Sequence, residues 1–148
     1  MREPRYALCL IALLAALSST GCASASRVTY IPEGTSYTAE SLTEALQSSD
    51  PGPAADVSTE EASDVRQSAL ADLRSQGDDA ALLADVLTTE FPADVSAVPY
   101  AAEHGTYEDR DAWIVFEAWG EADAKLSGRR VWVFAYDDLA VIAAQSIR

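Results

Sequence analysis

The sequence contains one histidine, His104, with carboxylates close to it at Glu103, Glu108, Asp109 and Asp111. A histidine beside carboxylates can transfer protons or take part in binding a cation. Metal ligands must converge on one point, however, and we expect this segment to be a solvated hairpin loop without such a spacing. We therefore keep an enzyme that uses His104 and the nearby carboxylates as an alternative hypothesis.

The other motifs argue against further kinds of catalytic or cofactor site. No G-x-S-x-G occurs, any Ser-His-Asp combination would need His104, and the 7 glycines are scattered singly, without the spacing of a phosphate-binding loop. Acidic residues pair at Glu121 with Asp123 and at Asp137 with Asp138. Neither pair has the alternating oxygen ligands around a glycine that calcium loops need. We predict no cofactor and no metal site, and we favour a protein that is not an enzyme.

Aromatic residues are concentrated in the C-terminal third of the sequence, where Trp113, Trp119, Trp132 and Tyr136 lie in apolar segments. Trp and Tyr commonly anchor binding interfaces, so an uncovered sheet face could present these side chains to a protein or glycan partner. They form a core instead if residues 27–49 cover the second face. We favour the core, because large exposed apolar patches are uncommon on soluble monomers.

The N-terminus has the features of an export signal. It begins with the basic residues Arg2 and Arg5, and an unbroken apolar run follows over residues 7–17. A membrane-spanning helix needs about 20 apolar residues, so this run is too short to be a stable span. Cys9 lies inside the run and would be lost with the signal.

The residues that follow, Thr20-Gly21-Cys22, resemble the lipobox of bacterial lipoproteins, although Ser19 stands where that family usually has Leu. The resemblance implies that residues 1–21 are a signal peptide and that Cys22 carries a diacylglycerol thioether. Acyl chains such as palmitate would then hold the protein on the extracytoplasmic face of the cell membrane. An A-x-A site offers the alternative, in which cleavage after Ala25 releases a secreted protein.

Apolar residues spaced three and four positions apart predict two helices, over residues 58–76 and 78–91. Ser58 and Glu61 have the spacing of a capping box, and Gly77 suits the end of the first helix. The second helix begins with Asp78 or Asp79 as its cap and stops at Pro92. The short connection predicts antiparallel packing.

The segments on either side of these helices differ from one another. Before them, residues 28–31 are strand-like, Thr38 can cap a short helix over residues 38–46, and residues 48–53 read as a linker. After them, β-branched and aromatic residues predict strands at 113–119, 130–136 and 139–144, with a weaker one at 96–101. Short connections predict an antiparallel meander.

The predicted fold class is therefore α+β, with a short N-terminal helix and an antiparallel helix pair packed on a three- to four-stranded antiparallel meander. We expect a signal peptide at 1–21, a tether and N-terminal segment with linker at 22–57, and the α+β domain at 58–148. The last module, with VFAYDDLAVI at residues 133–142, is similar to PepSY-type domains of exported bacterial proteins. That similarity implies a second alternative, a regulator of an exported protease.

Composition narrows the classes of partner. The chain has 148 residues, with 24 Asp and Glu against 10 Lys and Arg and a net charge of -14. Proteins that bind nucleic acid need clustered basic residues, so no nucleic-acid partner is expected. The sequence favours an acidic, lipid-anchored interaction or binding module, attached to the membrane through Cys22 and with an extracytoplasmic protein or glycan as partner.

Overall fold

The computed structural model describes residues 27–91, 95–122 and 124–148. The signal peptide expected at 1–21, the lipidation residue Cys22 and the alternative cleavage residue Ala25 lie outside the described residues. In chain order the elements are β1 (Thr29–Ile31), β2 (Ser36–Tyr37), α1 (Ala39–Ser48), the 3-10 helix η1 (Gly52–Asp56), α2 (Ala62–Arg74), α3 (Asp78–Glu90), β3 (Ala97–Tyr107), β4 (Arg110–Trp119), β5 (Gly128–Ala135) and β6 (Val141–Ile147).

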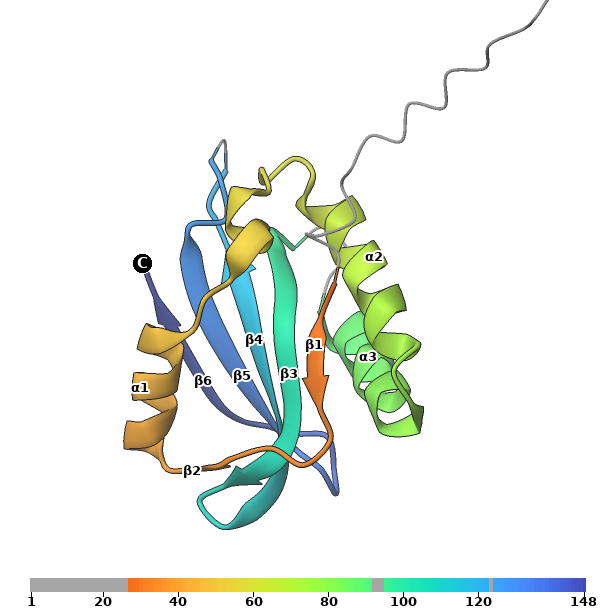
Figure 1. The fold of residues 1–148 in the computed structure, drawn as a ribbon, viewed down its shortest axis with the longest axis vertical. Coiled ribbons are helices and arrows are strands. Elements are labelled where there is room, and N and C mark those ends of the chain that lie inside the picture. The colour runs from red at the N-terminus through yellow and green to blue at the C-terminus, as the bar shows by residue number, and fades with distance from the viewer. Residues whose placement is uncertain (1–26, 92–94, 123) are drawn as a thin grey trace, which may run out of the picture.

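A six-stranded sheet forms the centre of the molecule, with strand order β1-β3-β4-β5-β6 and with β2 also paired to β3 (Figure 1). The meander from β3 to β6 is antiparallel, which confirms that part of the prediction. The expectation of a purely antiparallel sheet of three to four strands is wrong, because β1 and β2 pair with β3 in parallel. The long path through three helices before β3 provides the crossover that parallel pairing requires.

The helices α2 and α3 cover one face of the sheet, as predicted. Ala62, Ala69 and Leu73 of the α2 stripe are fully buried, and Leu83 and Leu87 of α3 join the same cluster. Burial of this apolar area is the main favourable contribution to their packing. The helices form a consecutive pair on the side of the sheet nearest β1 and β3 in Figure 1.

Both helix starts differ from the predicted ones. Ser58 and Glu61 make the reciprocal bonds of a capping box, but they do so in a turn, and α2 begins only at Ala62. Gly77 is the N-cap residue of α3, with a φ of 125° that glycine tolerates without the steric cost of a side chain. The first turn of α3 then contains Asp78 and Asp79, whose charges suit the helix N-terminus.

The second face of the sheet is covered in part by α1. The Thr38 side chain accepts a hydrogen bond from Ser41 N and so caps this helix, as the sequence predicts. Leu42 and Leu46 are fully buried and share a second hydrophobic cluster with Ile114 and other apolar residues of β4 and β5. Both faces of the central strands are therefore apolar because the helix pair covers one face and α1 covers part of the other.

The strands also reach further than predicted. The weak strand expected at residues 96–101 is an 11-residue strand, β3, which contains His104. The expectation of a solvated loop around His104 is therefore wrong: ladder pairing with β4 overrides the low β-propensity of this segment. Leu139 lies in the connection between β5 and β6, with a φ of 61°, so the last strand begins at Val141.

Candidate functional site

The part of the second sheet face that α1 leaves open contains a groove of about 410 Å³, which we call the Glu103 groove. Its floor comes from β3 and β4, one wall from β1 and the segment leading to Tyr37, and the other wall from the end of α1. Its lining includes Ile31, Tyr37, Ala45, Asp50, Tyr100, Ala101, Glu103 and Phe116.

Glu103 is the buried polar residue of this groove, with 6% of its surface exposed. Its Oε1 accepts a 2.6 Å hydrogen bond from the Tyr37 hydroxyl, and its Oε2 accepts one of 3.1 Å from Thr35 N. No lysine, arginine or histidine in the described ranges lies within ion-pair distance of this carboxylate. Glu103 is therefore held by neutral donors alone.

The position of Glu103 depends on Gly34. A Cβ atom on Gly34 would lie 2.5 Å from Glu103 Oε2, so only glycine lets the chain pass the carboxylate here. Gly34 N also donates a 2.7 Å hydrogen bond to His104 O, which ties this loop to β3. The loop between β1 and β2 thus forms a close-fitting wall around Glu103.

Tyr37 acts only as a donor toward Glu103. Burial, with a further contribution from the Glu103 hydrogen bond and charge, raises the pKa of Tyr37 to about 12. The phenol therefore keeps its proton at physiological pH and holds the Glu103 carboxylate in one orientation.

The rest of the groove lining combines aromatic and aliphatic side chains with polar ones from Thr29, Thr35, Ser48, Ser49 and Asp50. The rings of Tyr100 and Phe116 lie with their centroids 6.3 Å apart, and Ile31 is 45% exposed at the rim. The Tyr100 hydroxyl and Ser49 Oγ are hydrogen-bonded at 2.7 Å. Arg129 Nη1 donates to Ser49 O at 2.8 Å, so the end of α1 is fixed as a wall.

His104 lies on the opposite face of the sheet, against α3. Its Nδ1 is 3.5 Å from Asp79 Oδ2 and its Nε2 is 3.4 Å from Asp111 Oδ1, although the buried Nε2 makes no hydrogen bond. The Tyr136 ring stacks on the imidazole at 4.3 Å between centroids, and its hydroxyl donates to Asp79 Oδ1 at 3.1 Å. That hydrogen bond raises the pKa of Tyr136.

Of the four carboxylates expected near His104, the structure brings only Asp111 to the imidazole. Glu103 faces the groove, and Glu108 accepts a hydrogen bond from Ala39 N at the start of α1. Asp109 occupies the β3–β4 turn, with a φ of 63°. In the described part of the chain, no group of three or more His, Cys, Asp or Glu residues is placed to hold a metal ion.

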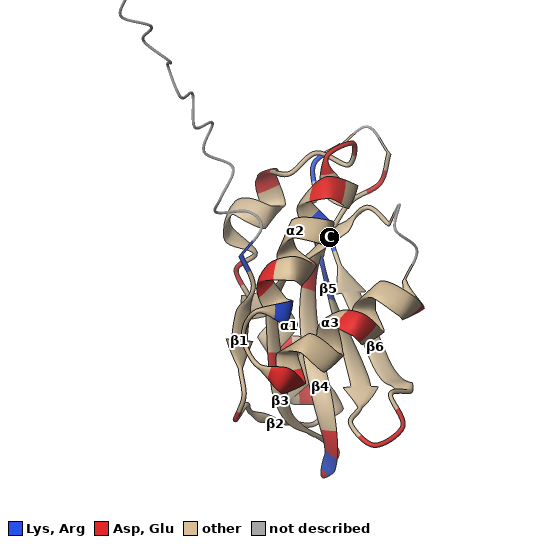
Figure 2. Ribbon diagram, turned by 90° about the vertical axis from the view of Figure 1, so that its right-hand side faces the viewer, with Lys and Arg blue, Asp and Glu red and all other residues tan. Residues whose placement is uncertain are grey.

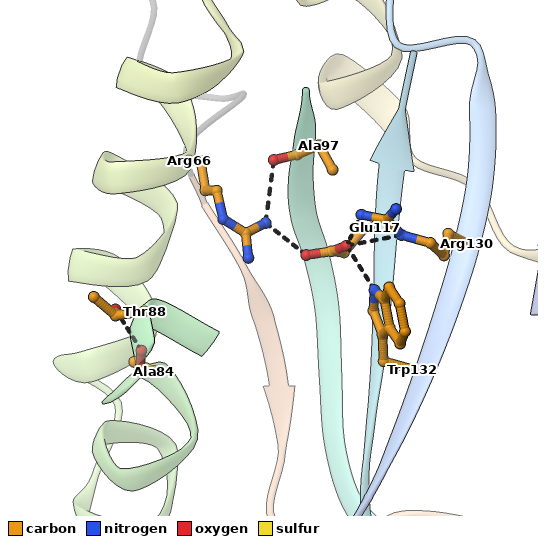
Figure 3. Close-up of polar contacts among 7 residues, drawn as sticks. All are labelled: Arg66, Ala84, Thr88, Ala97, Glu117, Arg130 and Trp132. Carbon is orange, nitrogen blue, oxygen red and sulfur yellow. Dashed lines mark hydrogen bonds and ion pairs between the residues drawn. The ribbon is translucent and has the colours of Figure 1, made fainter. Parts of the chain in front are cut away.

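A buried ion-pair cluster around Glu117 joins the sheet to α2, on the sheet face opposite the Glu103 groove (Figure 3). Arg66 Nη1 donates to Glu117 Oε1 at 2.6 Å and to Ala97 O at 3.2 Å. Arg130 Nη2 and Trp132 Nε1 both donate to Glu117 Oε2, at 2.7 and 3.0 Å. Burial raises the pKa of Glu117, but the two guanidinium groups outweigh it, so the net pKa is lowered.

The sequence does indicate this cluster, through the positions of two charged residues rather than through the overall composition. Glu117 is a single carboxylate inside an otherwise apolar segment, and Arg66 falls within the buried stripe of α2. Such residues are rarely buried unless they are paired with an opposite charge. With every Glu117 oxygen taken by donors from within the chain, the cluster is structural.

The aromatic residues singled out from the sequence do not form one surface. Trp113 is fully buried under the helix pair, whereas Trp119, Trp132 and Tyr136 are half-buried. The indole nitrogens of Trp119 and Trp132 already donate within the chain, to Arg129 O and to Glu117. These aromatics mainly stabilise the fold.

Three of the four residues in these acidic pairs have partners within the chain, and the fourth, Asp123, lies outside the described residues. Arg110 Nη2 lies 2.7 Å from Asp137 Oδ1 and 3.3 Å from Asp138 Oδ2, and Glu121 pairs with Arg148. Figure 2 shows further acidic residues on helices, strands and loops of the face that it presents. Asp137 and Asp138 therefore act as turn residues held by one arginine.

No protein-family model matches this chain, and comparisons with curated proteins and with solved structures give no significant match. Across the ranges that the structure describes, no helix is long and apolar enough to cross a membrane. The arrangement of the chain's own residues is therefore the basis for assigning a function.

Proposed function

We propose that the protein is a lipid-anchored extracytoplasmic binding protein whose ligand occupies the Glu103 groove. The observation that carries this proposal is the groove itself: an open region of about 410 Å³ on a sheet face that α1 only partly covers. Its volume is within the range of small-molecule sites, and it combines apolar walls with a few fixed polar groups, as such sites do.

The chemistry of the lining favours binding over catalysis. The Tyr37 hydroxyl donates a hydrogen bond to Glu103, and the one histidine of the chain lies on the other face of the sheet. A general base usually works with a second group that is free to take or give a proton. Here the polar groups are arranged to hold a ligand in one orientation.

The anchor is supported by the N-terminal sequence. The apolar run over residues 7–17 is followed by the lipobox-like Thr20-Gly21-Cys22, and a lipid on Cys22 would attach the protein without a transmembrane helix. Only five residues separate Cys22 from Val28, the first buried residue of the core. The groove would then lie close to the membrane surface.

The groove is tested by NMR on the full chain in lipid nanodiscs, with labelled alanine methyl groups. Ala45 and Ala101 line the groove, and the exposed Ala144 of β6 is a remote reference. We expect saturable shifts at Ala45 and Ala101, but not at Ala144, with 2-phenylethanol or 2-phenylethylammonium.

Filling the groove provides the control for that experiment. Ala101→Phe places a ring on the groove floor and should abolish the shifts at Ala45, whereas Ala144→Phe should preserve them. If neither compound shifts Ala45 or Ala101 in the wild-type chain, the groove is not a ligand site and the proposal fails.

Acid–base catalysis at His104 is a second candidate function. The observation that favours it is the placement of His104 between Asp79 and Asp111, since a carboxylate partner can orient an imidazole for proton transfer. His104→Ala would abolish the biological activity if this candidate is correct. The same substitution would leave activity intact if the groove is the functional site.

A further inference from the structure

We infer that the ligand of the Glu103 groove is a small organic cation whose ammonium group binds the Glu103 carboxylate. This inference rests on the proposed function and adds the chemical class of the ligand. Three features of the groove carry it: an unpaired buried carboxylate, aromatic walls, and an excess of negative charge.

The carboxylate is the first feature. Buried charges in proteins are normally paired, because removal of a charge from water costs far more than hydrogen bonds with neutral groups return. Glu103 has only Tyr37 and Thr35 as partners in the described ranges, and both are neutral donors. A cation in the groove would supply the missing partner.

The Glu103 carboxylate also has lone-pair sites that accept no hydrogen bond from the described residues. An ionised carboxylate offers about four lone-pair sites, and an ammonium group brings three donors on a compact charge. One hydrogen bond is made to each Glu103 oxygen, by Tyr37 to Oε1 and by Thr35 to Oε2. Each Glu103 oxygen therefore has an acceptor site that no donor among the described residues fills.

The apolar side chains of the groove indicate the chemistry of the part of the ligand beyond its ammonium group. The rings of Tyr100 and Phe116 and the side chain of Ile31 border the groove, so the ligand should carry an apolar body. Aromatic faces also attract cations directly, and this attraction is stronger in a partly desolvated site. An ammonium group on an aliphatic or aromatic body satisfies both features.

The charges around the groove favour a cation. Asp50 is a second carboxylate on the lining, and none of the described lining residues is a lysine or arginine. Two arginines lie at the margins of the groove and outside its lining: Arg129 donates hydrogen bonds to carbonyls at the end of α1, and Arg27 lines an adjoining pocket. The net charge of -14 adds a long-range attraction for cations.

A matched ligand series tests this inference on the wild-type full chain in nanodiscs. The alanine-methyl titration is run with 2-phenylethylammonium, 2-phenylethanol and 3-phenylpropanoate, which share one aromatic body and differ in charge. We expect the ammonium to bind about tenfold more tightly than the alcohol, and the carboxylate more weakly than either, because a hydrogen bond to a charged group is stronger than a neutral one.

Two variants test whether Glu103 is the source of the expected preference for the ammonium over the alcohol. Glu103→Gln should equalise the affinities for the ammonium and the alcohol, whereas Glu44→Gln, which removes an exposed charge of α1 outside the groove lining, should keep the difference. Equal affinities in the wild-type chain would overturn this inference and leave the proposed function standing. Absence of shifts at Ala45 and Ala101 with all three compounds would overturn both.

Discussion

Tyr37 and Glu103 are joined by a hydrogen bond of 2.6 Å that connects β2 to β3 on the floor of the groove. The two residues are 66 positions apart in the sequence, and the parallel pairing of β2 with β3 brings them together. Since the phenol donates and the carboxylate accepts, the bond fixes the orientation of Glu103, the buried carboxylate on the groove lining.

We predict that Tyr37→Phe lowers the free energy of unfolding by about 1 kcal/mol at pH 8, because one carboxylate oxygen loses its donor. The raised pKa makes this contribution depend on pH. It is fully present below the ordinary tyrosine value of 10.0 and is lost as the pH rises toward about 12.

Urea unfolding of the wild type and of Tyr37→Phe at pH 8, 10 and 11 measures this dependence. The difference between the two proteins should shrink above pH 10. Tyr107→Phe, which removes a hydroxyl outside the groove lining, is the control. A difference that stays constant over the whole range would show that the hydrogen bond does not hold the proton on Tyr37.

Glu117→Gln should destabilise the protein by about 3–5 kcal/mol at pH 7, because it leaves the buried Arg66 without its opposite charge. The pKa of Glu117 is lowered in the folded state, so its contribution is present above the ordinary glutamate value of 4.5 and is lost as the pH falls below it.

Chemical unfolding at pH 7 and at pH 3.5 checks both parts of this prediction. The difference between the wild type and Glu117→Gln should be smaller at pH 3.5 than at pH 7. The exposed Glu44→Gln should change stability by less than about 0.5 kcal/mol. A Glu117→Gln protein as stable as the wild type at pH 7 would contradict the role of the cluster.

Much of this fold could be predicted from local sequence, and the groove could not. The helices α2 and α3 show clear apolar periodicity with Gly77 between them, and β4 and β5 are rich in β-branched and aromatic residues. β3 was underestimated because its second half, around His104, has few such residues and depends on pairing with β4.

The groove is assembled from segments that are far apart in the sequence, so no single stretch of sequence predicts it. Tyr37, Ala45, Glu103 and Phe116 come from four different elements. The short strands β1 and β2 bring the Tyr37 wall into place by parallel pairing, and nothing in their few residues specifies that partner. The sequence alone groups Glu103 with His104 because the two residues are adjacent, although adjacent strand residues point to opposite faces of the sheet.

His104→Ala should leave affinity for groove ligands within about twofold of the wild type, because the imidazole lies on the other face of the sheet. It should lower stability by about 1 kcal/mol through loss of stacking on Tyr136. Titration of both proteins with 2-phenylethylammonium measures the first effect. Loss of binding with an intact fold would mean that His104 contributes to the site.

Cys22→Ala should abolish incorporation of a metabolic lipid label and move the full chain out of the membrane fraction. Cys9→Ala, inside the apolar run, should leave both unchanged, which separates loss of a thiol from loss of the anchor. Membrane fractionation that is identical for Cys22→Ala and the wild type would rule out lipidation at this cysteine.

The most direct measurement is a crystal structure of the protein with 2-phenylethylammonium. The account predicts density in the Glu103 groove, with the ammonium nitrogen at a hydrogen-bond distance of about 2.7–3.1 Å from a Glu103 oxygen and the ring against Phe116 and Tyr100. An empty groove at saturating ligand, or a ligand bound elsewhere with Glu103 still unpaired, would contradict it.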